Sequence, residues 1–149
     1  MTTGSILGPK CGSYSFARKF EPLVLLPVTS PQGLPTVDSL QIQLVLANLP
    51  ENALQSVCTS HRHGKRVSVD ACPINDQEAR VSVTDRGPGV PPERAAEIFE
   101  PLHSGTSGGM GMGLAISQAI IHAHGGRLWY QPNPVGGAIF RFTLRIARP

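Results

Sequence analysis

A helix is predicted over residues 38–60, because apolar side chains recur there at intervals of three and four residues. The positions that form this stripe are Ile42, Val45, Leu46, Leu49 and Ala53. Asp38 precedes the stripe and is a suitable N-cap. Another face of the same helix carries Asn48 and Asn52. Pro50 lies between these asparagines, and inside a helix a proline removes one backbone N–H and costs about 3 kcal/mol or introduces a kink.

A second helix is predicted from about Gly111 to Ala123. Its sequence is apolar apart from three polar positions, which are Ser117, Gln118 and His122. Such a helix is typical of a largely buried element. The pair Gly125-Gly126 is expected to end it. A shorter helix is predicted over residues 92–99.

Alternating apolar and polar residues predict the strands. Residues 67–71 and 79–85 are expected to form an antiparallel hairpin, and residues 127–131 and 137–146 two further strands. Residues 1–33 have little pattern and are interpreted as a leader that can contribute an edge strand around residues 23–28. Residues 34–149 are interpreted as one domain. The order of elements predicts an α/β (α+β) two-layer sandwich, with helices on one face of a mixed sheet.

Composition excludes several classes of protein. The length of 149 residues favours a single domain, and the formal net charge of +3 is too small to indicate a nucleic-acid-binding protein. The three cysteines show neither a C-x-x-C metal pair nor a disulfide framework, which favours a cytoplasmic location. The apolar run at residues 23–26 is too short to cross a membrane. No membrane segment is expected in this chain.

The stretch GGMGMGLAIS at residues 108–117 is the first candidate binding site. It lacks the lysine of a P-loop, and the spacing of Gly109, Gly111 and Gly113 does not match a dinucleotide fingerprint. What remains is a glycine loop that opens a helix. The backbone N–H groups of such a loop form an anion site, which suits phosphate.

Two further groups of residues fit a nucleotide. Asp85 stands at the end of a predicted strand, where its carboxylate can accept a hydrogen bond from an exocyclic amine such as that of adenine. Gly87 and Gly89 follow it and would let the backbone lie against a flat ring. The carboxamide oxygens of Asn48 and Asn52 are suitable ligands for Mg²⁺, which also binds substrate phosphates.

Taken in order, these residues resemble the N, G1, F and G2 boxes of sensor histidine kinases. The matching elements are Asn48…Asn52, Asp85-x-Gly87-x-Gly89, Phe99-Glu100-Pro101-Leu102 and Gly109-x-Gly111-x-Gly113-Leu114. The stretches FEPL, GMGMGLAIS and AHGGRLW are especially similar to the subgroup of oxygen-sensing and nitrogen-regulatory kinases. The resemblance covers roughly residue 34 to the end, and it implies the Bergerat ATP-binding fold.

The resemblance also implies roles for these residues. Asp85 would bind the adenine amine, in a pocket shaped by Gly87 and Gly89. Asn52 would hold Mg²⁺, and Asn48 would lie near the γ-phosphate, so both asparagines are candidate catalytic residues. Residues 100–110 would form a lid over ATP. The residues expected around the phosphates are Thr106, Gly109, Met110, Gly111, Met112, Gly113 and Leu114.

Three features depart from the family pattern. Pro50 is one, because a kink there would misplace Asn52. The closest subgroup usually has Thr-Thr-Lys in the lid, where this chain has Ser104-Gly105-Thr106 and therefore lacks a phosphate-contacting lysine. None of the five histidines is followed by an acid, as the family's phosphoacceptor is. We therefore expect the chain to bind Mg·ATP without phosphorylating itself, and to act on a histidine of another domain or chain that passes the phosphoryl group to a response regulator.

Two alternative functions stay open. One is a degenerate, non-catalytic ATP-binding regulator, which the absent lysine and Pro50 favour. The other is a serine kinase of the anti-sigma type, which shares the fold. A gyrase-like clamp ATPase is disfavoured, because that class has a glutamate base where this chain has Asn48, and a carboxamide cannot take a proton from water.

Overall fold

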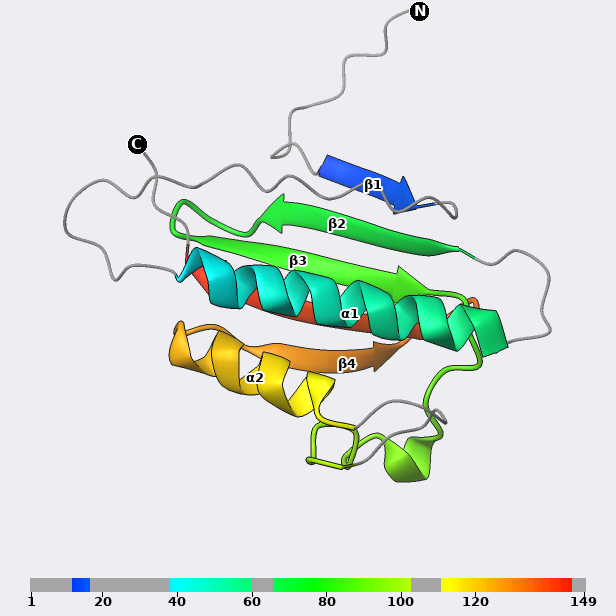
Figure 1. Ribbon diagram of the computed structural model, residues 1–149. Helices are drawn as coiled ribbons and strands as arrows, with labels where there is room; N and C mark the ends of the chain where they lie inside the picture. Colours follow the sequence, from blue (N-terminus) through cyan, green and yellow to red (C-terminus); the bar gives the residue numbers. More distant parts are fainter. Residues whose placement is uncertain (1–11, 17–37, 60–65, 103–110, 146–149) are drawn as a thin grey trace, which may run out of the picture.

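The computed structural model describes residues 12–16, 38–59, 66–102 and 111–145 (Figure 1). In chain order the elements are β1 (Gly12–Phe16), α1 (Ser39–Thr59), β2 (Val67–Pro73), β3 (Glu78–Asp85), the 3-10 helix η1 (Pro92–Arg94), α2 (Gly113–Ala123), β4 (Leu128–Pro132) and β5 (Ala138–Arg145). The predicted hairpin and the two predicted C-terminal strands are therefore confirmed, and both long helices lie where the apolar spacing placed them.

The strands form one five-stranded sheet in the order β1-β2-β3-β5-β4. Both α1 and α2 cover the same face of this sheet (Figure 1), so the predicted two-layer α/β sandwich is confirmed. The prediction of a mixed sheet needs one correction, because every neighbouring pair of described strands is antiparallel. Alternation along a strand predicts which face is buried, but its direction depends on the path of the connections.

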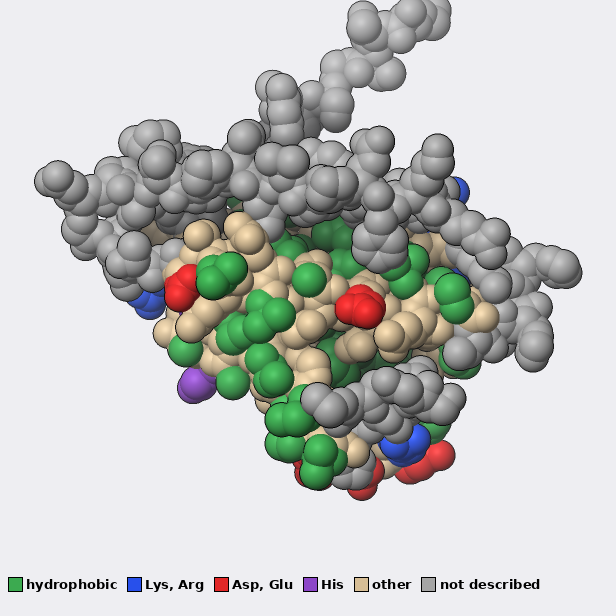
Figure 2. Space-filling view, in the orientation of Figure 1, with side chains coloured by type: hydrophobic (Ala, Val, Ile, Leu, Met, Phe, Trp, Pro, Cys, Tyr) green, Lys and Arg blue, Asp and Glu red, His purple; other side chains and the backbone are tan. Residues whose placement is uncertain are grey.

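The core lies between the helices and the sheet. The fully buried apolar side chains come from both layers and include Val45, Leu49, Val83, Ile121 and Phe142, each 0% exposed. The apolar stripes of α1 and α2 face inward because this orientation removes these side chains from water. The outward surface of the two helices also carries apolar side chains, among them Leu40, Leu44 and Ile116 (Figure 2).

Helix α1 begins as predicted and continues through Pro50 to Thr59. The carboxylate of Asp38 accepts hydrogen bonds from the N–H groups of Leu40 and Gln41, at 3.0 and 3.3 Å, which confirms it as the N-cap. Pro50 removes one N–H donor without ending the helix. Both asparagines are half-buried in this continuous helix, and whether Pro50 misplaces Asn52 stays a prediction.

Helix α2 begins at Gly113, two residues later than predicted, because Gly111 has a φ of +67° and cannot belong to a right-handed helix. Its end is confirmed. Gly125 has a φ of +72°, and the N–H groups of Gly125 and Gly126 donate to the carbonyls of His122 and Ile121, each at 2.9 Å. These two bonds form a Schellman motif, which uses the glycine pair to terminate the helix.

Other expectations are corrected. The helix predicted over residues 92–99 is only the three-residue η1, followed by turns whose hydrogen bonds link residues three apart. The edge strand predicted around residues 23–28 lies outside the described residues, whereas strand β1 was not predicted. Cys72 is disulfide-bonded, which the scattered cysteines did not indicate. Cysteine pairing depends on how segments distant in the sequence pack together, which the spacing of the cysteines does not show.

Candidate functional site

Asp85, the last residue of β3, is almost completely buried, with 2% of its surface exposed. Its Oδ1 accepts hydrogen bonds from the N–H of Gly87, at 2.8 Å, and from the N–H of Ala138, at 3.2 Å. Among the described residues, no group donates to Oδ2. One oxygen therefore fixes the carboxylate, and the other stays available to a donor on a ligand.

Burial also sets the acidity of this group. Desolvation raises the pKa of the Asp85 carboxyl above its usual range, because the low-dielectric interior disfavours the charged form. The backbone N–H groups of Gly87 and Ala138 act in the opposite direction by stabilising the carboxylate. The result is a buried carboxyl held by fixed dipoles, with no charged side chain among the causes of the shift.

The glycines after Asp85 bring the backbone close to two other elements. A β carbon at Gly87 would collide with the Ser56 hydroxyl of α1. Gly89 has a φ of +76°, and a β carbon there would lie 3.0 Å from the carbonyl oxygen of Gly137. Both positions require glycine, so the backbone after Asp85 lies directly against α1 on one side and against the turn between β4 and β5 on the other.

Asn48 of α1 lies beside the start of α2, and Asn52 follows it one turn further along the same helix. The amide of Asn48 donates to the hydroxyl of the fully buried Ser117, at 3.4 Å. A β carbon at Gly113 would lie 3.8 Å from the Asn48 side chain, which places the asparagine against the first residue of α2. Asn52 is half-buried one turn further along, and no hydrogen bond to its side chain is present within the described part of the chain.

Asn48, Asn52 and Ser56 together form a polar stripe along α1, spaced four residues apart. One end of the stripe contacts the start of α2, and the other contacts Gly87 next to Asp85. Eight residues of helix span about 12 Å. The sequence prediction brought together both asparagines and Asp85, but it missed Ser56. The i, i+4, i+8 spacing could have identified this serine.

The start of α2 has the features of an anion site. Met112 precedes the helix and makes no side-chain cap hydrogen bond, so its side chain does not satisfy the first N–H groups of α2. The N–H of Leu102 donates to the carbonyl of Gly111, at 3.0 Å, and this bond joins the two ends of the intervening loop. Of the residues predicted around phosphate, Gly111, Met112, Gly113 and Leu114 lie here. Thr106, Gly109 and Met110 fall outside the described residues.

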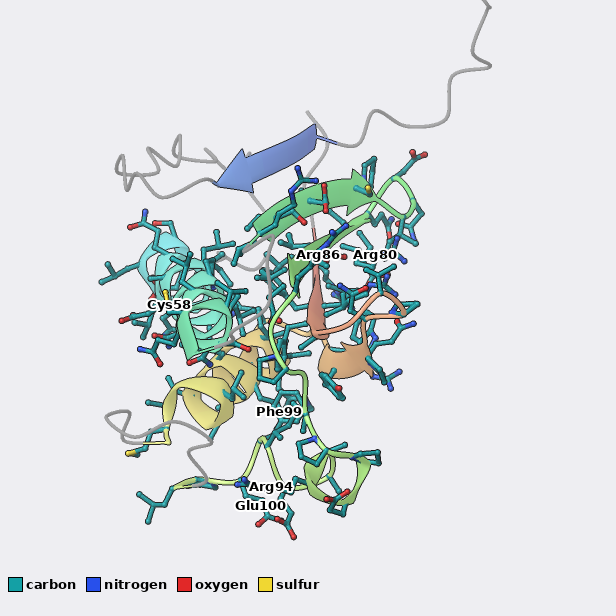
Figure 3. The ribbon with its side chains drawn as sticks, turned by 90° about the vertical axis from the view of Figure 1, so that its right-hand side faces the viewer. Cys58, Arg80, Arg86, Arg94, Phe99 and Glu100 are labelled. Atoms are coloured by element: carbon teal, nitrogen blue, oxygen red, sulfur yellow. The ribbon has the colours of Figure 1, made fainter. Side chains whose placement is uncertain are left out.

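The FEPL segment is anchored to the sheet by Phe99. Its ring packs edge-on against Phe140 of β5, with centroids 6.3 Å apart and an interplanar angle of 82°. In Figure 3, Phe99 lies nearer the sheet than Arg94 of η1 and Glu100 do. This aromatic contact holds the chain that leads into the loop beside α2.

The described residues contain no group of three or more His, Cys, Asp or Glu side chains that could hold a metal ion. Within the same residues, no helix is both long enough and apolar enough to cross a bilayer. A metal at this site would therefore need ligands of another kind, such as the free carboxamide of Asn52 together with the phosphates of a nucleotide.

Comparison with known sequences identifies the family. The sequence model described as "Histidine kinase-, DNA gyrase B-, and HSP90-like ATPase" matches residues 37–148. The chain belongs to this family. It is 43% identical over 110 residues to the sensor protein FixL of Bradyrhizobium diazoefficiens, covering 74% of this chain and 21% of FixL. It is 37% identical over 122 residues to the adaptive-response sensory kinase SasA of Trichormus variabilis, covering 78% of this chain and 29% of SasA.

Solved structures place the chain within the same family. The mycobacterial sensor histidine kinase MprB superposes with a TM-score of 0.65 at 29% identity, covering 72% of this chain and 74% of MprB. The catalytic domain of the histidine kinase ThkA gives a TM-score of 0.62 at 30% identity, covering 72% of this chain and 68% of that domain. The predicted resemblance and the predicted fold are thus confirmed. The chain therefore carries the ATPase domain of this family, and it spans less than a third of the FixL and SasA sequences it matches.

Proposed function

We propose that the chain binds Mg·ATP along the polar stripe of α1, with adenine beside Asp85 and the phosphates beside the start of α2. The observation that carries this proposal is the Asp85 carboxylate, whose Oδ1 is fixed by two backbone N–H groups. The free Oδ2 is then available to accept a hydrogen bond from the adenine amine. Gly87 and Gly89 bring the backbone after Asp85 close against α1 and the turn between β4 and β5, which fixes the main chain beside this carboxylate.

The other end of the stripe supplies the phosphate contacts. The N–H groups around Gly111, Met112, Gly113 and Leu114 meet the negative charge of the triphosphate at the positive end of α2. We assign Thr106, Gly109 and Met110 to the same contacts on the basis of the family resemblance. The crystal structure of full-length ShkA is a complex with AMPPNP, an analogue of ATP. ShkA is 32% identical to this chain and superposes with a TM-score of 0.59, covering 73% of this chain and 22% of ShkA.

Asn52 is the residue proposed to hold Mg²⁺. Its carboxamide has no hydrogen-bond partner among the described residues and lies between the adenine and phosphate ends of the stripe. A single protein oxygen supplemented by phosphates and water is a normal environment for this ion. When bound, Mg²⁺ would neutralise charge that develops on the phosphate oxygens.

In the proposed reaction, the bond between the γ-phosphorus and the β-bridging oxygen breaks, and a bond forms to a histidine nitrogen. ADP leaves with the bonding electron pair. The residues of this chain contribute position and charge stabilisation, not covalent chemistry. Asn48 stands near the γ-phosphate as a hydrogen-bonding group, and a carboxamide is not a base that can activate water. We therefore propose transfer to a histidine of another domain or chain, which then supplies a cytoplasmic response regulator.

The central test is the affinity for Mg·ATP, measured by titration calorimetry for the wild type and for Asp85→Asn. Asparagine would present an NH₂ group to the adenine amine in one of its orientations, and it removes the charge that strengthens the hydrogen bond. We expect about tenfold weaker binding or more. Equal affinity in the two proteins would overturn the assignment of Asp85 to adenine.

A second test separates the open alternatives. Labelled ATP is supplied with and without an acceptor helical hairpin from a related kinase. The proposal expects no label on the chain alone and acid-labile phosphohistidine on the hairpin. A non-catalytic regulator, which the Ser104-Gly105-Thr106 sequence favours, would bind ATP without labelling the hairpin. Acid-stable phosphoserine on a protein substrate would instead indicate the serine kinase.

A further inference from the structure

The turn between β4 and β5 holds the backbone of Asp85. The side-chain amide of Asn133 donates a hydrogen bond to the Asp85 carbonyl oxygen at 2.9 Å, across 48 positions of sequence. Asn133 itself is half-buried. This is a contact with the main chain at the end of β3, so Asn133 acts on Asp85 without approaching its carboxylate.

Asn133 also organises its own turn. Its Oδ1 accepts from the N–H of Val135 at 3.3 Å, its backbone N–H donates to the Gly137 carbonyl at 3.1 Å, and its carbonyl accepts from Gly136 at 2.9 Å. The side-chain oxygen of Asn133 thus binds the turn, and its NH₂ group binds Asp85. Because different atoms make the two hydrogen bonds, a mutation can remove one bond and keep the other.

The same turn delivers the second hydrogen bond to the carboxylate. Gly137 has a φ of +104° and packs so tightly on the Asp85 backbone that a β carbon would collide with the Asp85 carbonyl oxygen. The next residue, Ala138, donates its N–H to Asp85 Oδ1 at 3.2 Å. One turn therefore holds both the carbonyl and the carboxylate of Asp85, and Asn133 is the side chain that joins the turn to the strand.

We propose that Asn133 is a positioning residue for nucleotide selection, which sets the direction of Asp85 Oδ2 and through it the preference for adenine. This inference rests on the proposed role of Asp85 in binding the base. A correctly placed carboxylate oxygen accepts from the adenine amine and repels the carbonyl oxygen that guanine has at the same place. Loss of the Asn133 bond frees the turn, lets the Ala138 contact lengthen and weakens this discrimination.

The chain offers a matched control at Asn75. This residue makes the same local turn contact in the β2–β3 hairpin, where its Oδ1 accepts from the N–H of Gln77 at 2.8 Å. Within the described part of the chain it makes no hydrogen bond to Asp85, and it lies in a different hairpin. Asn133→Asp keeps the oxygen for Val135, removes the NH₂ donor and places an acceptor against the Asp85 carbonyl. Asn75→Asp makes the same chemical change without reaching Asp85.

The experiment measures the Mg·ATP and Mg·GTP dissociation constants of the wild type, Asp85→Asn, Asn133→Asp and Asn75→Asp by calorimetry, with folding checked by circular dichroism. We expect Asn133→Asp to weaken ATP binding on the order of tenfold and GTP binding much less, so that the GTP/ATP ratio of dissociation constants falls. Asn75→Asp should leave both constants within about twofold.

The outcomes separate this inference from the proposed function. If Asp85→Asn weakens ATP binding but Asn133→Asp and Asn75→Asp have the same GTP/ATP ratio of dissociation constants, the positioning role is wrong and the Asp85 assignment stands. If Asp85→Asn binds ATP like the wild type, the adenine assignment fails and the role of Asn133 fails with it. Should Asn133→Asp not fold, Asn133→Ser replaces it, since serine can serve the turn but is too short to reach the Asp85 carbonyl.

Discussion

At the scale of single residues, Asp85 combines a structural cost with a functional use. An ionised carboxyl is expensive to bury, and this one has only backbone dipoles to offset the loss of water. Fixed dipoles of that kind do not reorganise when a ligand arrives, so the cost of orienting the acceptor is met during folding. In the proposed function, this buried and pre-oriented carboxylate favours selective recognition of a base over maximal stability.

This cost predicts how stability depends on pH. Burial raises the pKa of folded Asp85 above the unfolded value of an aspartate, about 3.9. Between those two pKa values the folded state binds more protons than the unfolded state, so the contribution of this group to the free energy of unfolding falls as the pH rises. Its contribution is greatest below the unfolded pKa and is lost as the pH passes the folded pKa.

Urea unfolding at a series of pH values, for the wild type and Asp85→Asn, isolates this effect. The wild-type stability minus the mutant stability should decrease with increasing pH over that interval and level off above it. The subtraction removes the contributions of the other carboxyl groups. A difference that is flat or that increases with pH would show that Asp85 is not destabilised by ionisation in the folded protein.

A residue of the candidate site could be predicted from the sequence when the residues it acts with are close to it along the chain. Asn48 and Asn52 are near neighbours on one helix, and Asp85 and its glycines form one short motif, so local spacing was enough to find them. Ser117, Asn133 and Ala138 reach the site only through packing and strand pairing. Nothing in the local pattern around Asn133 indicates that its amide serves a residue 48 positions away.

At the scale of elements, the ends of the helices were the most predictable features, because capping is local chemistry. Asp38 and the Gly125-Gly126 pair act as expected. The two helix ends are also joined to each other, since the His124 ring accepts a hydrogen bond from the Asp38 N–H at 3.0 Å. The segment after β3 was harder to predict, because its prolines and acidic residues suit both a helix and a series of turns.

Pro50 supplies a prediction at this scale. Replacing it by alanine restores the N–H that the carbonyl of Leu46 lacks and removes a steric clash, a gain of about 3 kcal/mol. Proline also restricts the unfolded chain, which offsets up to about 1 kcal/mol. We therefore expect Pro50→Ala to raise the free energy of unfolding by about 2 kcal/mol, measured by urea denaturation.

The affinity of Pro50→Ala for Mg·ATP should stay within about twofold of wild type, because α1 already holds Asn48 and Asn52 on one face. Glu51→Ala, at the exposed neighbouring position, is the matched control and should change stability by no more than about 0.5 kcal/mol. A Pro50→Ala protein that is less stable than the wild type would mean that the proline is required by its surroundings. A large change in affinity would mean that it positions Asn52.

At the scale of the whole molecule, the site is assembled from parts that cannot function alone. The sheet supplies Asp85, α1 supplies the polar stripe, and α2 supplies the proposed phosphate-binding end, while Phe99 ties the connecting segment to the sheet. The fold class followed from the order of the elements. The antiparallel pairing and the position of β1 could not be predicted from that order, because both depend on contacts between distant segments.

We expect the domain to have the architecture of the related kinases and to lack one positive charge near the phosphates. The subgroup that this sequence resembles usually has Thr-Thr-Lys where this chain has Ser104-Gly105-Thr106, so the resemblance implies a lysine at the position of Thr106. A cation near the γ-phosphate stabilises charge in the transition state. Thr106→Lys should therefore raise the rate of phosphoryl transfer to a supplied acceptor hairpin by about tenfold or more, measured with labelled ATP at saturating nucleotide. Thr106→Gln adds a long polar side chain without charge and should leave the rate near that of the wild type. Equal rates for the lysine and glutamine variants would mean that a lysine at position 106 does not reach the phosphates, and that the lid differs from that of the related kinases in more than this one residue.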